Sequence, residues 1–205
     1  MASATERFIF YHIPKTGGTW VKVALKEAGV KTGAVRTTGG PHPFNLKWAH
    51  ACPGTVPERS KDGRFSFCFV RQPIAWYTSY WAFRSRKGAR RDENFPADGL
   101  WSDDFDQFVN NLLDAYPGGF VTALYQYYTG ARCDKVDFIG RQETLADDLV
   151  KALTLAGETF DEAALRATRQ CNKSPGKLKK LCILSEATQA RIADCERWVS
   201  ETFYA

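Results

Sequence analysis

The sequence predicts a single α/β domain, spanning residues 1–205, in which a central, mainly parallel sheet carries helices on both faces. Two apolar runs with the length of buried strands, Phe8–Ile13 and Phe65–Val70, are each followed by a helical pattern. A third strand-like run, Lys135–Ile139, also precedes one. Strands that alternate with helices indicate parallel strands joined by helical crossovers. The length of 205 residues suits one such domain better than two.

Turn residues, caps and apolar spacing place the other elements. Pro14 ends the first strand, and Gly29 ends the helix after it. Pro73 suits a first helical turn, and Asp161 and Ser185 are typical N-caps. From these signals we expect, in chain order, a helix from Thr19, a short strand at Leu46–Ala49, a loop or broken helix at Cys52–Gly63, a helix after Pro73, a long loop or lid at Arg84–Trp101, helices over Asp104–Ala115, Val121–Tyr128 and Thr144–Gly157, and helices from Asp161 and from Ser185. The last helix is expected to bury one stripe, formed by Ile192, Cys195, Val199 and Phe203.

The segment after the first strand has the chemistry of an anion-binding loop. Its sequence, Pro14-Lys15-Thr16-Gly17-Gly18-Thr19, joins a strand to the start of a helix. The two glycines allow a tight turn, and the first N–H groups of the helix lack partners and favour negative charge. The lysine adds a positive charge, and the two threonines add hydroxyl donors. We therefore expect a P-loop-like site for a phosphate group here.

The residue order differs from that of a Walker A loop, in which the lysine follows the glycines. Here Lys15 precedes them, and Trp20 comes after Thr19. The strand Phe65–Val70 ends in Arg71 rather than in an aspartate that could hold magnesium for phosphoryl transfer. The loop is therefore predicted to hold its anion without a metal.

A second phosphate site is predicted at the end of the strand Phe65–Val70. Arg71 stands at its carboxyl end, where ligands of open α/β sheets bind. Ser79 lies about two turns further on, in the helix that Pro73 begins, so it can face the same ligand. An arginine fork with a hydroxyl suits a phosphate group.

Together the two segments resemble those of the sulfotransferases that use 3′-phosphoadenosine 5′-phosphosulfate (PAPS). Pro14–Thr19 is similar to their 5′-phosphosulfate loop, and Arg71-x-Pro73-x-x-Trp76-x-x-Ser79 to their 3′-phosphate motif. The familiar form of that motif has a second arginine where Trp76 stands. Two weaker similarities are those of Phe138–Leu145 to a later strand-to-helix segment and of Asn172–Lys180 to a loop that covers the nucleotide.

The resemblance implies that PAPS donates a sulfuryl group to an acceptor hydroxyl, such as that of a small molecule or a carbohydrate. Lys15 would stabilise the leaving phosphate or the bridging oxygen, and Arg71 and Ser79 would hold the 3′-phosphate. The residues expected to bind the donor are Lys15, Thr16, Gly17, Gly18, Thr19, Trp20, Arg71 and Ser79. Trp76 and its aromatic neighbours on the same helix are expected to pack in the core.

The acceptor hydroxyl needs a general base, for which histidine is the usual choice. We favour His50, because it follows a short predicted strand and can lie at the carboxyl edge of the sheet near Lys15; some members of the family resembled use a histidine at a comparable place. His12 lies in an apolar run and is expected to be a buried or sheet-edge histidine. His42 belongs to a Gly/Pro-rich loop, where we expect it to be exposed or to face the acceptor. Glu143 is an alternative carboxylate base.

Charge and composition limit the partners. The net charge is +5, with basic runs at Arg84–Arg91 and Lys173–Lys180. An anionic donor or acceptor explains this excess as well as RNA does, and no aromatic RNA-binding signature accompanies it, so no nucleic acid is expected. The first run is either a solvated lid or a contact for an anionic acceptor. The second either covers the nucleotide or is an exposed loop.

Other features indicate a soluble, cytoplasmic protein. No apolar stretch has the length of a membrane span, and the N-terminus lacks a signal-peptide pattern. The six cysteines include no C-x-x-C pair, so we expect free thiols and no metal site. Two other functions stay open: a small-molecule kinase with an atypical phosphate loop, and a non-catalytic module that binds nucleotide or RNA. The oligomeric state is not predicted.

Overall fold

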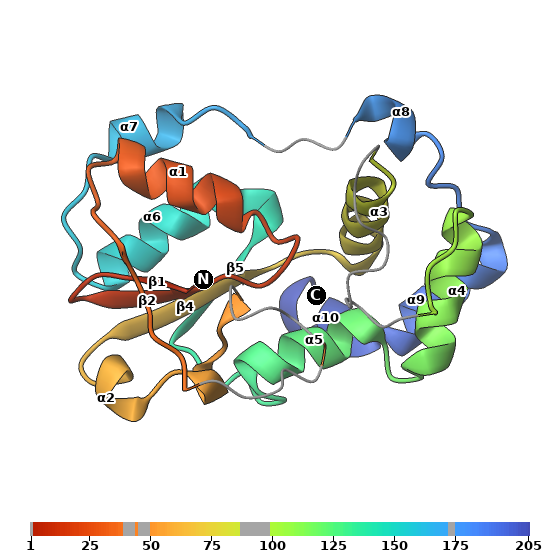
Figure 1. Ribbon diagram of the computed structural model, residues 1–205, viewed down its shortest axis with the longest axis horizontal. Coiled ribbons are helices and arrows are strands. Elements are labelled where there is room, and N and C mark those ends of the chain that lie inside the picture. Colours follow the sequence, from red (N-terminus) through yellow and green to blue (C-terminus); the bar gives the residue numbers. More distant parts are fainter. Residues whose placement is uncertain (1, 39–43, 45–49, 87–98, 172–174) are drawn as a thin grey trace. The chain divides into compact units, whose positions relative to one another are not determined.

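The computed structural model describes residues 2–38, 44, 50–86, 99–171 and 175–205 (Figure 1). The predicted strand Leu46–Ala49, His42 and most of the basic run Arg84–Arg91 are therefore outside the described residues. The chain forms two compact units. Unit 1 comprises Met1–His42, Lys47–Arg71 and Gln126–Asn172, and unit 2 comprises Pro43–Leu46, Gln72–Tyr125 and Lys173–Ala205. That the whole chain is one domain stays a prediction.

Unit 1 contains a mixed sheet of five strands among the described residues, in the order β3-β1-β2-β4-β5. The strands are β1 (Ser3–Ala4), β2 (Phe8–Tyr11), β3 (Gly33–Ala34), β4 (Phe65–Val70) and β5 (Phe138–Arg141). The pairs β2–β4 and β4–β5 are parallel, whereas β1 runs antiparallel to both β2 and β3. The prediction of a mainly parallel sheet thus holds for β2, β4 and β5 only. The antiparallel strands β1 and β3 were not predicted, because two residues are too few to show an alternation of apolar and polar side chains.

Helices of unit 1 cover one face of this sheet (Figure 1). They are α1 (Gly18–Glu27), α6 (Leu145–Leu155) and α7 (Glu162–Ala167), with the short turns η2 (Pro53–Thr55), α2 (Glu58–Lys61) and η3 (Gln142–Thr144) elsewhere in the unit. Phe8 and Phe10 of β2 pack with Phe67 and Phe69 of β4 against this helical layer. Four alternate residues of these strands, Ile9, Tyr11, Cys68 and Val70, are also buried.

Two strand boundaries in unit 1 differ from the prediction. Strand β2 ends at Tyr11 instead of Ile13, and strand β5 begins at Phe138 instead of Lys135. The carboxylate of Asp137 accepts hydrogen bonds from the backbone N–H and the hydroxyl of Ser66, which fastens the start of the strand by a side chain. The segment Cys52–Gly63 is a broken helix, as expected, made of η2 and α2.

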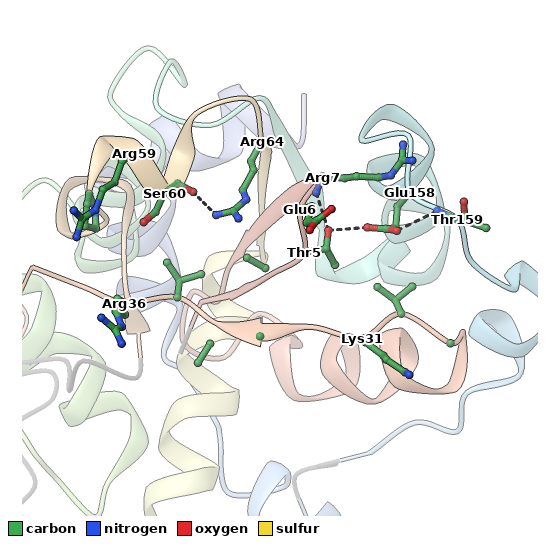
Figure 2. A pocket seen from close by; sticks show the side chains of 17 residues that line it. Thr5, Glu6, Arg7, Lys31, Arg36, Arg59, Ser60, Arg64, Glu158 and Thr159 are labelled. Atoms are coloured by element: carbon green, nitrogen blue, oxygen red, sulfur yellow. Dashed lines mark hydrogen bonds between the residues drawn. The ribbon is translucent and has the colours of Figure 1, made fainter.

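A cavity of about 720 Å³ opens in unit 1 beside β1 and β3 (Figure 2). Its walls come from the start of β2, from the segment between α1 and β3, and from α2 with the residues that precede β4. Because these are the amino ends of the parallel strands, the cavity lies at the edge of the sheet opposite the loop that follows β2.

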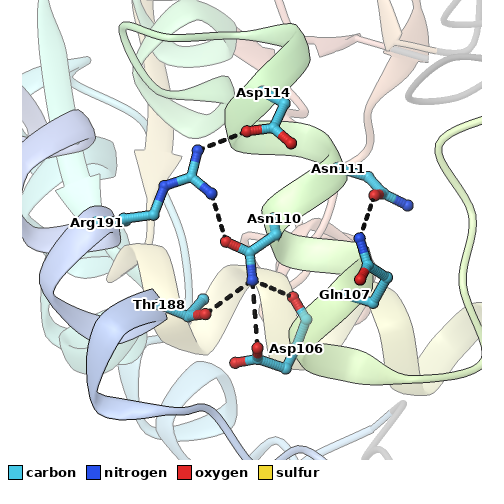
Figure 3. Close-up of polar contacts among 7 residues, drawn as sticks. All are labelled: Asp106, Gln107, Asn110, Asn111, Asp114, Thr188 and Arg191. Atoms are coloured by element: carbon cyan, nitrogen blue, oxygen red, sulfur yellow. Dashed lines mark hydrogen bonds and ion pairs between the residues drawn. The ribbon is translucent and has the colours of Figure 1, made fainter.

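Unit 2 is helical. It contains α3 (Pro73–Arg84), α4 (Phe105–Ala115), most of α5 (Phe120–Thr129), α8 (Gly176–Lys179), α9 (Glu186–Cys195) and α10 (Arg197–Phe203). Polar side chains join α4 to α9 (Figure 3). Arg191 of α9 donates to Asn110 at 2.5 Å and to Asp114 at 2.6 Å, and Asn110 donates to Thr188 at 2.8 Å. These contacts fix the register of the two helices.

The predicted last helix is two helices, because the chain bends at Glu196 between α9 and α10. The Glu196 side chain is fully buried in unit 2. Its carboxylate accepts hydrogen bonds from the Tyr77 hydroxyl at 2.5 Å, from the Val121 N–H at 3.0 Å, and from the N–H and hydroxyl of Thr122 at 2.7 Å each. A carboxylate 74 residues away in sequence thus satisfies the first-turn donors of α5.

Candidate functional site

The loop after β2 has a backbone that only some residues can adopt. Lys15 and Gly17 both have positive φ angles, 66° and 89°, and Gly17 is the residue immediately before α1. A Cβ at Gly17 would lie 2.6 Å from Cδ2 of Leu145, the first residue of α6. The backbone angle therefore favours glycine at this position, and a larger residue would also displace the end of the Leu145 side chain. The predicted glycine turn is confirmed.

Gly18 makes room for a histidine ring. A Cβ at Gly18 would lie 1.9 Å from Cδ2 and 2.3 Å from Nε2 of His12. The imidazole of His12 therefore packs directly on the first residue of α1. Sequence reasoning assigned His12 to the core or the sheet edge and did not foresee this contact. The only signal for this contact in the sequence is that His12 lies six residues before Gly18. In the structure His12 is the first residue after β2.

His50 lies beside His12, at the carboxyl edge of the sheet as expected. The two ring centroids are 4.9 Å apart. Nδ1 of His50 is 3.0 Å from the backbone carbonyl of His12. Because a carbonyl can only accept, Nδ1 carries the proton and Nε2 of the neutral ring keeps its lone pair. The Tyr128 hydroxyl donates to the His50 carbonyl at 2.6 Å and so fixes the backbone.

Burial keeps both histidines neutral. Desolvation holds the pKa of His12 well below its usual range, and the neighbouring His50 lowers it further. Desolvation also lowers the pKa of His50, although the hydrogen bond to the His12 carbonyl opposes this effect. Near neutral pH both imidazole rings are therefore uncharged, and each keeps one nitrogen with a lone pair.

These shifts predict that acid destabilises the protein. The folded chain resists protonation of both rings, while the unfolded chain binds protons near pH 6.5, so stability is lost as the pH falls below that value. We expect the free energy of unfolding to fall by up to about 1.4 kcal/mol per pH unit for each histidine. Denaturant unfolding at pH 7.5, 6.5 and 5.5 measures this, and equal values at all three would contradict the assignment.

Two predicted donor-binding side chains bond within the loop region. The Thr16 side chain is fully buried, and its hydroxyl donates to the Ile13 carbonyl at 2.9 Å. Arg71, directly after β4, donates from Nη1 to the Lys15 carbonyl at 3.3 Å. The Thr16 hydroxyl therefore stabilises the loop by a hydrogen bond to the residue that precedes Pro14. Arg71 brings its guanidinium to the backbone of the same loop, so the ends of β2 and β4 meet there.

The remaining predicted residues lie on the two helices that follow these strands. Thr19 is exposed in the first turn of α1, and the Trp20 indole N–H donates to the Thr168 carbonyl at 3.3 Å. Ser79 is half-buried on α3 of unit 2, so its pairing with Arg71 stays a prediction. Trp76 is buried and stacks on Tyr80 with centroids 5.3 Å apart, which confirms its packing role.

The other residues considered in the sequence have clear positions too. Glu143 is exposed in η3. Arg84 is 7% exposed, so this first member of its basic run is not solvated, and Arg86 lies over the Phe83 ring. The lysines of α8 are exposed. All six cysteines are free, and the described residues include no group of three or more side chains that could hold a metal ion.

A family model describing the sulfotransferase family matches residues 1–175 of the chain. The chain belongs to the sulfotransferase family. No curated protein and no solved structure matches it significantly. The family match covers the loop after β2, His50 and Arg71, whereas α9 and α10 of this sulfotransferase lie outside it. Among the helices that the structure describes, none has the length and hydropathy needed to cross a membrane.

The contact between Gly18 and His12 predicts a coupled effect of two substitutions in this sulfotransferase. Gly18→Ala forces a methyl group into the ring and is expected to lower the free energy of unfolding by about 1–3 kcal/mol. Gly54→Ala is the matched control, because a Cβ there meets nothing within 4 Å. In His12→Ala the space is free, so adding Gly18→Ala should then cause little further loss. Additive losses in the double variant would show that the two residues do not touch.

Proposed function

We propose that this sulfotransferase transfers the sulfuryl group of PAPS to an acceptor hydroxyl, with Lys15 and the loop after β2 at the leaving phosphate and His50 as the general base. The observation that carries this proposal is that His50 contacts His12, whose ring packs on Gly18 of the glycine loop. Transfer to a hydroxyl needs a base and an anion-binding group held near each other, and His12 contacts both the candidate base and the loop.

Several features of the loop fit a phosphate group in a P-loop-like manner. Gly17 has a positive φ angle of 89° immediately before α1, and the first N–H groups of that helix favour negative charge. Lys15 and Arg71 add two positive charges. Lys15 belongs to the loop, and the guanidinium of Arg71 donates a hydrogen bond to the Lys15 carbonyl. PAPS supplies an activated sulfuryl group and needs no metal for its transfer. Arg71 with Ser79 would bind the 3′-phosphate, and Trp20 would flank the 5′ end.

The chain's residues have two roles in the transfer step. His50 takes the proton of the acceptor hydroxyl at Nε2 while the hydroxyl oxygen bonds to sulfur. Lys15 neutralises the negative charge that develops on the bridging oxygen as its bond to sulfur breaks, and adenosine 3′,5′-bisphosphate leaves. His12 holds His50 through its carbonyl and rests its ring on Gly18, which sets the spacing between base and loop.

Donor binding separates this function from an atypical kinase. Adenosine 3′,5′-bisphosphate at about 100 times its dissociation constant should stabilise the protein without magnesium, raising the melting temperature by about 5–10 °C. Stabilisation by Mg·ATP instead would favour the kinase. Incubation with radiolabelled PAPS and a panel of hydroxyl-bearing small molecules and sugars then tests transfer. Binding without transfer to any acceptor, unchanged by His50→Asn, would favour a non-catalytic module.

A further inference from the structure

The cavity at the amino edge of the sheet is lined by an excess of positive side chains (Figure 2). Its cations are Arg7, Lys31, Arg36, Arg59 and Arg64, and its carboxylates are Glu6 and Glu158. They come from four separate stretches of unit 1, before β2, around β3, from α2 to β4, and after α6. Segments far apart in sequence thus bring five cations and two carboxylates to one cavity.

Most of these cations have no carboxylate partner. Lys31, Arg36 and Arg59 form no ion pair within the described part of the chain, and all three are exposed. Arg64 is half-buried and donates only to a neutral group, the Ser60 carbonyl, at 2.7 Å. Like charges held around one cavity repel each other, so an anion placed between them would relieve this repulsion.

Hydrogen bonds partly occupy two other charged residues of the cavity lining, Arg7 and Glu158. Arg7 donates to the Gly157 carbonyl at 2.5 Å. Glu158 accepts from the Thr5 hydroxyl at 2.7 Å and from the Thr159 N–H at 3.2 Å. Glu6 is exposed and is the carboxylate that a bound anion would have to avoid. Lys31, Arg36, Arg59 and Arg64 are therefore the lining cations that can attract an anion.

The lining also indicates what kind of anion fits. Among the described residues no aromatic side chain lines the cavity, so this part of the chain offers no platform on which a nucleobase could stack. Guanidinium groups match the paired oxygens of sulfate and phosphate groups. A volume of about 720 Å³ is ample for a ligand that carries several such groups.

We propose that this cavity is a second anion site, distinct from the loop after β2, which binds a ligand bearing two or more sulfate or phosphate groups through Lys31, Arg36, Arg59 and Arg64. The site does not depend on the proposed transfer reaction, because the two places lie at opposite edges of the sheet. A sulfated oligosaccharide and a polyphosphate share this chemistry, and the experiment separates them.

Calorimetric titration of the full chain at 0.15 M salt, where weak surface attraction is screened, tests the proposal. The probes are a heparin-derived tetrasaccharide and tripolyphosphate. We expect one or both to bind, and Arg36→Gln/Arg59→Gln to weaken that binding at least about tenfold through lost charged hydrogen bonds. Both side chains are exposed, so the variant should fold. Arg64→Gln should weaken binding further.

The control variant Lys26→Gln/Arg132→Gln removes the same charge from exposed positions outside the cavity. Its affinity should stay within about twofold of the wild-type value. Lys15→Met should also keep the binding, because Lys15 belongs to the other edge. Failure of both probes to bind, equal weakening by the control variant, or loss of binding in Lys15→Met with retention in Arg36→Gln/Arg59→Gln would each overturn the proposal.

Discussion

Lys15→Met is expected to lower the rate of sulfuryl transfer by about a hundred- to a thousandfold, the usual effect of removing one group that stabilises developing negative charge. Methionine keeps the length of the side chain and removes its charge. The loop around it stays tied by the Thr16 hydroxyl and by Arg71, so its shape should survive. The measurement is the rate of sulfate transfer from radiolabelled PAPS at saturating donor.

Lys26→Met provides the matched control for this experiment. Lys26 is exposed in the last turn of α1, the helix that the loop precedes. Its loss should leave transfer unchanged and should alter the melting temperature as little as Lys15→Met does. If Lys15→Met transfers sulfate at the wild-type rate, Lys15 has no role in the reaction.

Glu196→Ala is expected to lower the free energy of unfolding by about 3–5 kcal/mol. The carboxylate accepts four hydrogen bonds in the interior of unit 2. Without it, the Tyr77 hydroxyl and the donors of Val121 and Thr122 remain buried without an acceptor, and each such group costs about 1–3 kcal/mol. The net value is smaller than the sum because the desolvation that raises the pKa of Glu196 is also removed.

Two further variants make this result specific. Glu196→Gln keeps one acceptor oxygen but brings N–H donors towards the same partners, so its loss should be intermediate. Glu201→Ala removes an exposed carboxylate from α10 and should change the free energy of unfolding by less than about 0.5 kcal/mol. Denaturant unfolding measures all three. A loss of less than 1 kcal/mol for Glu196→Ala would contradict the role assigned to its hydrogen bonds.

Local signals allowed much of the secondary structure to be predicted. The run Phe65–Val70 is β4 with the predicted bounds, because six apolar or small residues end at Arg71 and Pro73. Asp161 and Ser185 cap their helices as predicted, through side chains that accept the N–H group three residues on, and Asp104, which was predicted as the first residue of its helix, is its cap in the same way. The α5 helix likewise ends where Gly130 has a positive φ angle of 81°.

The features that were missed depend on contacts between distant segments. Nothing near Glu196 shows that its carboxylate serves the start of α5, so the bend after α9 could not be predicted. The candidate site shows the same limit. The loop and the position of His50 followed from sequence, whereas the His12 ring on Gly18 depends on how β2 meets α1 in space.

The position of Glu196 has a practical consequence for anyone preparing a shorter fragment. The family match stops at residue 175, which invites trimming there. Such a fragment would lack Glu196, which accepts hydrogen bonds from the first turn of α5, and Arg191, which binds Asp114 of α4. We expect it to accumulate as insoluble aggregate on expression, even though it retains the whole recognisable signature of its family.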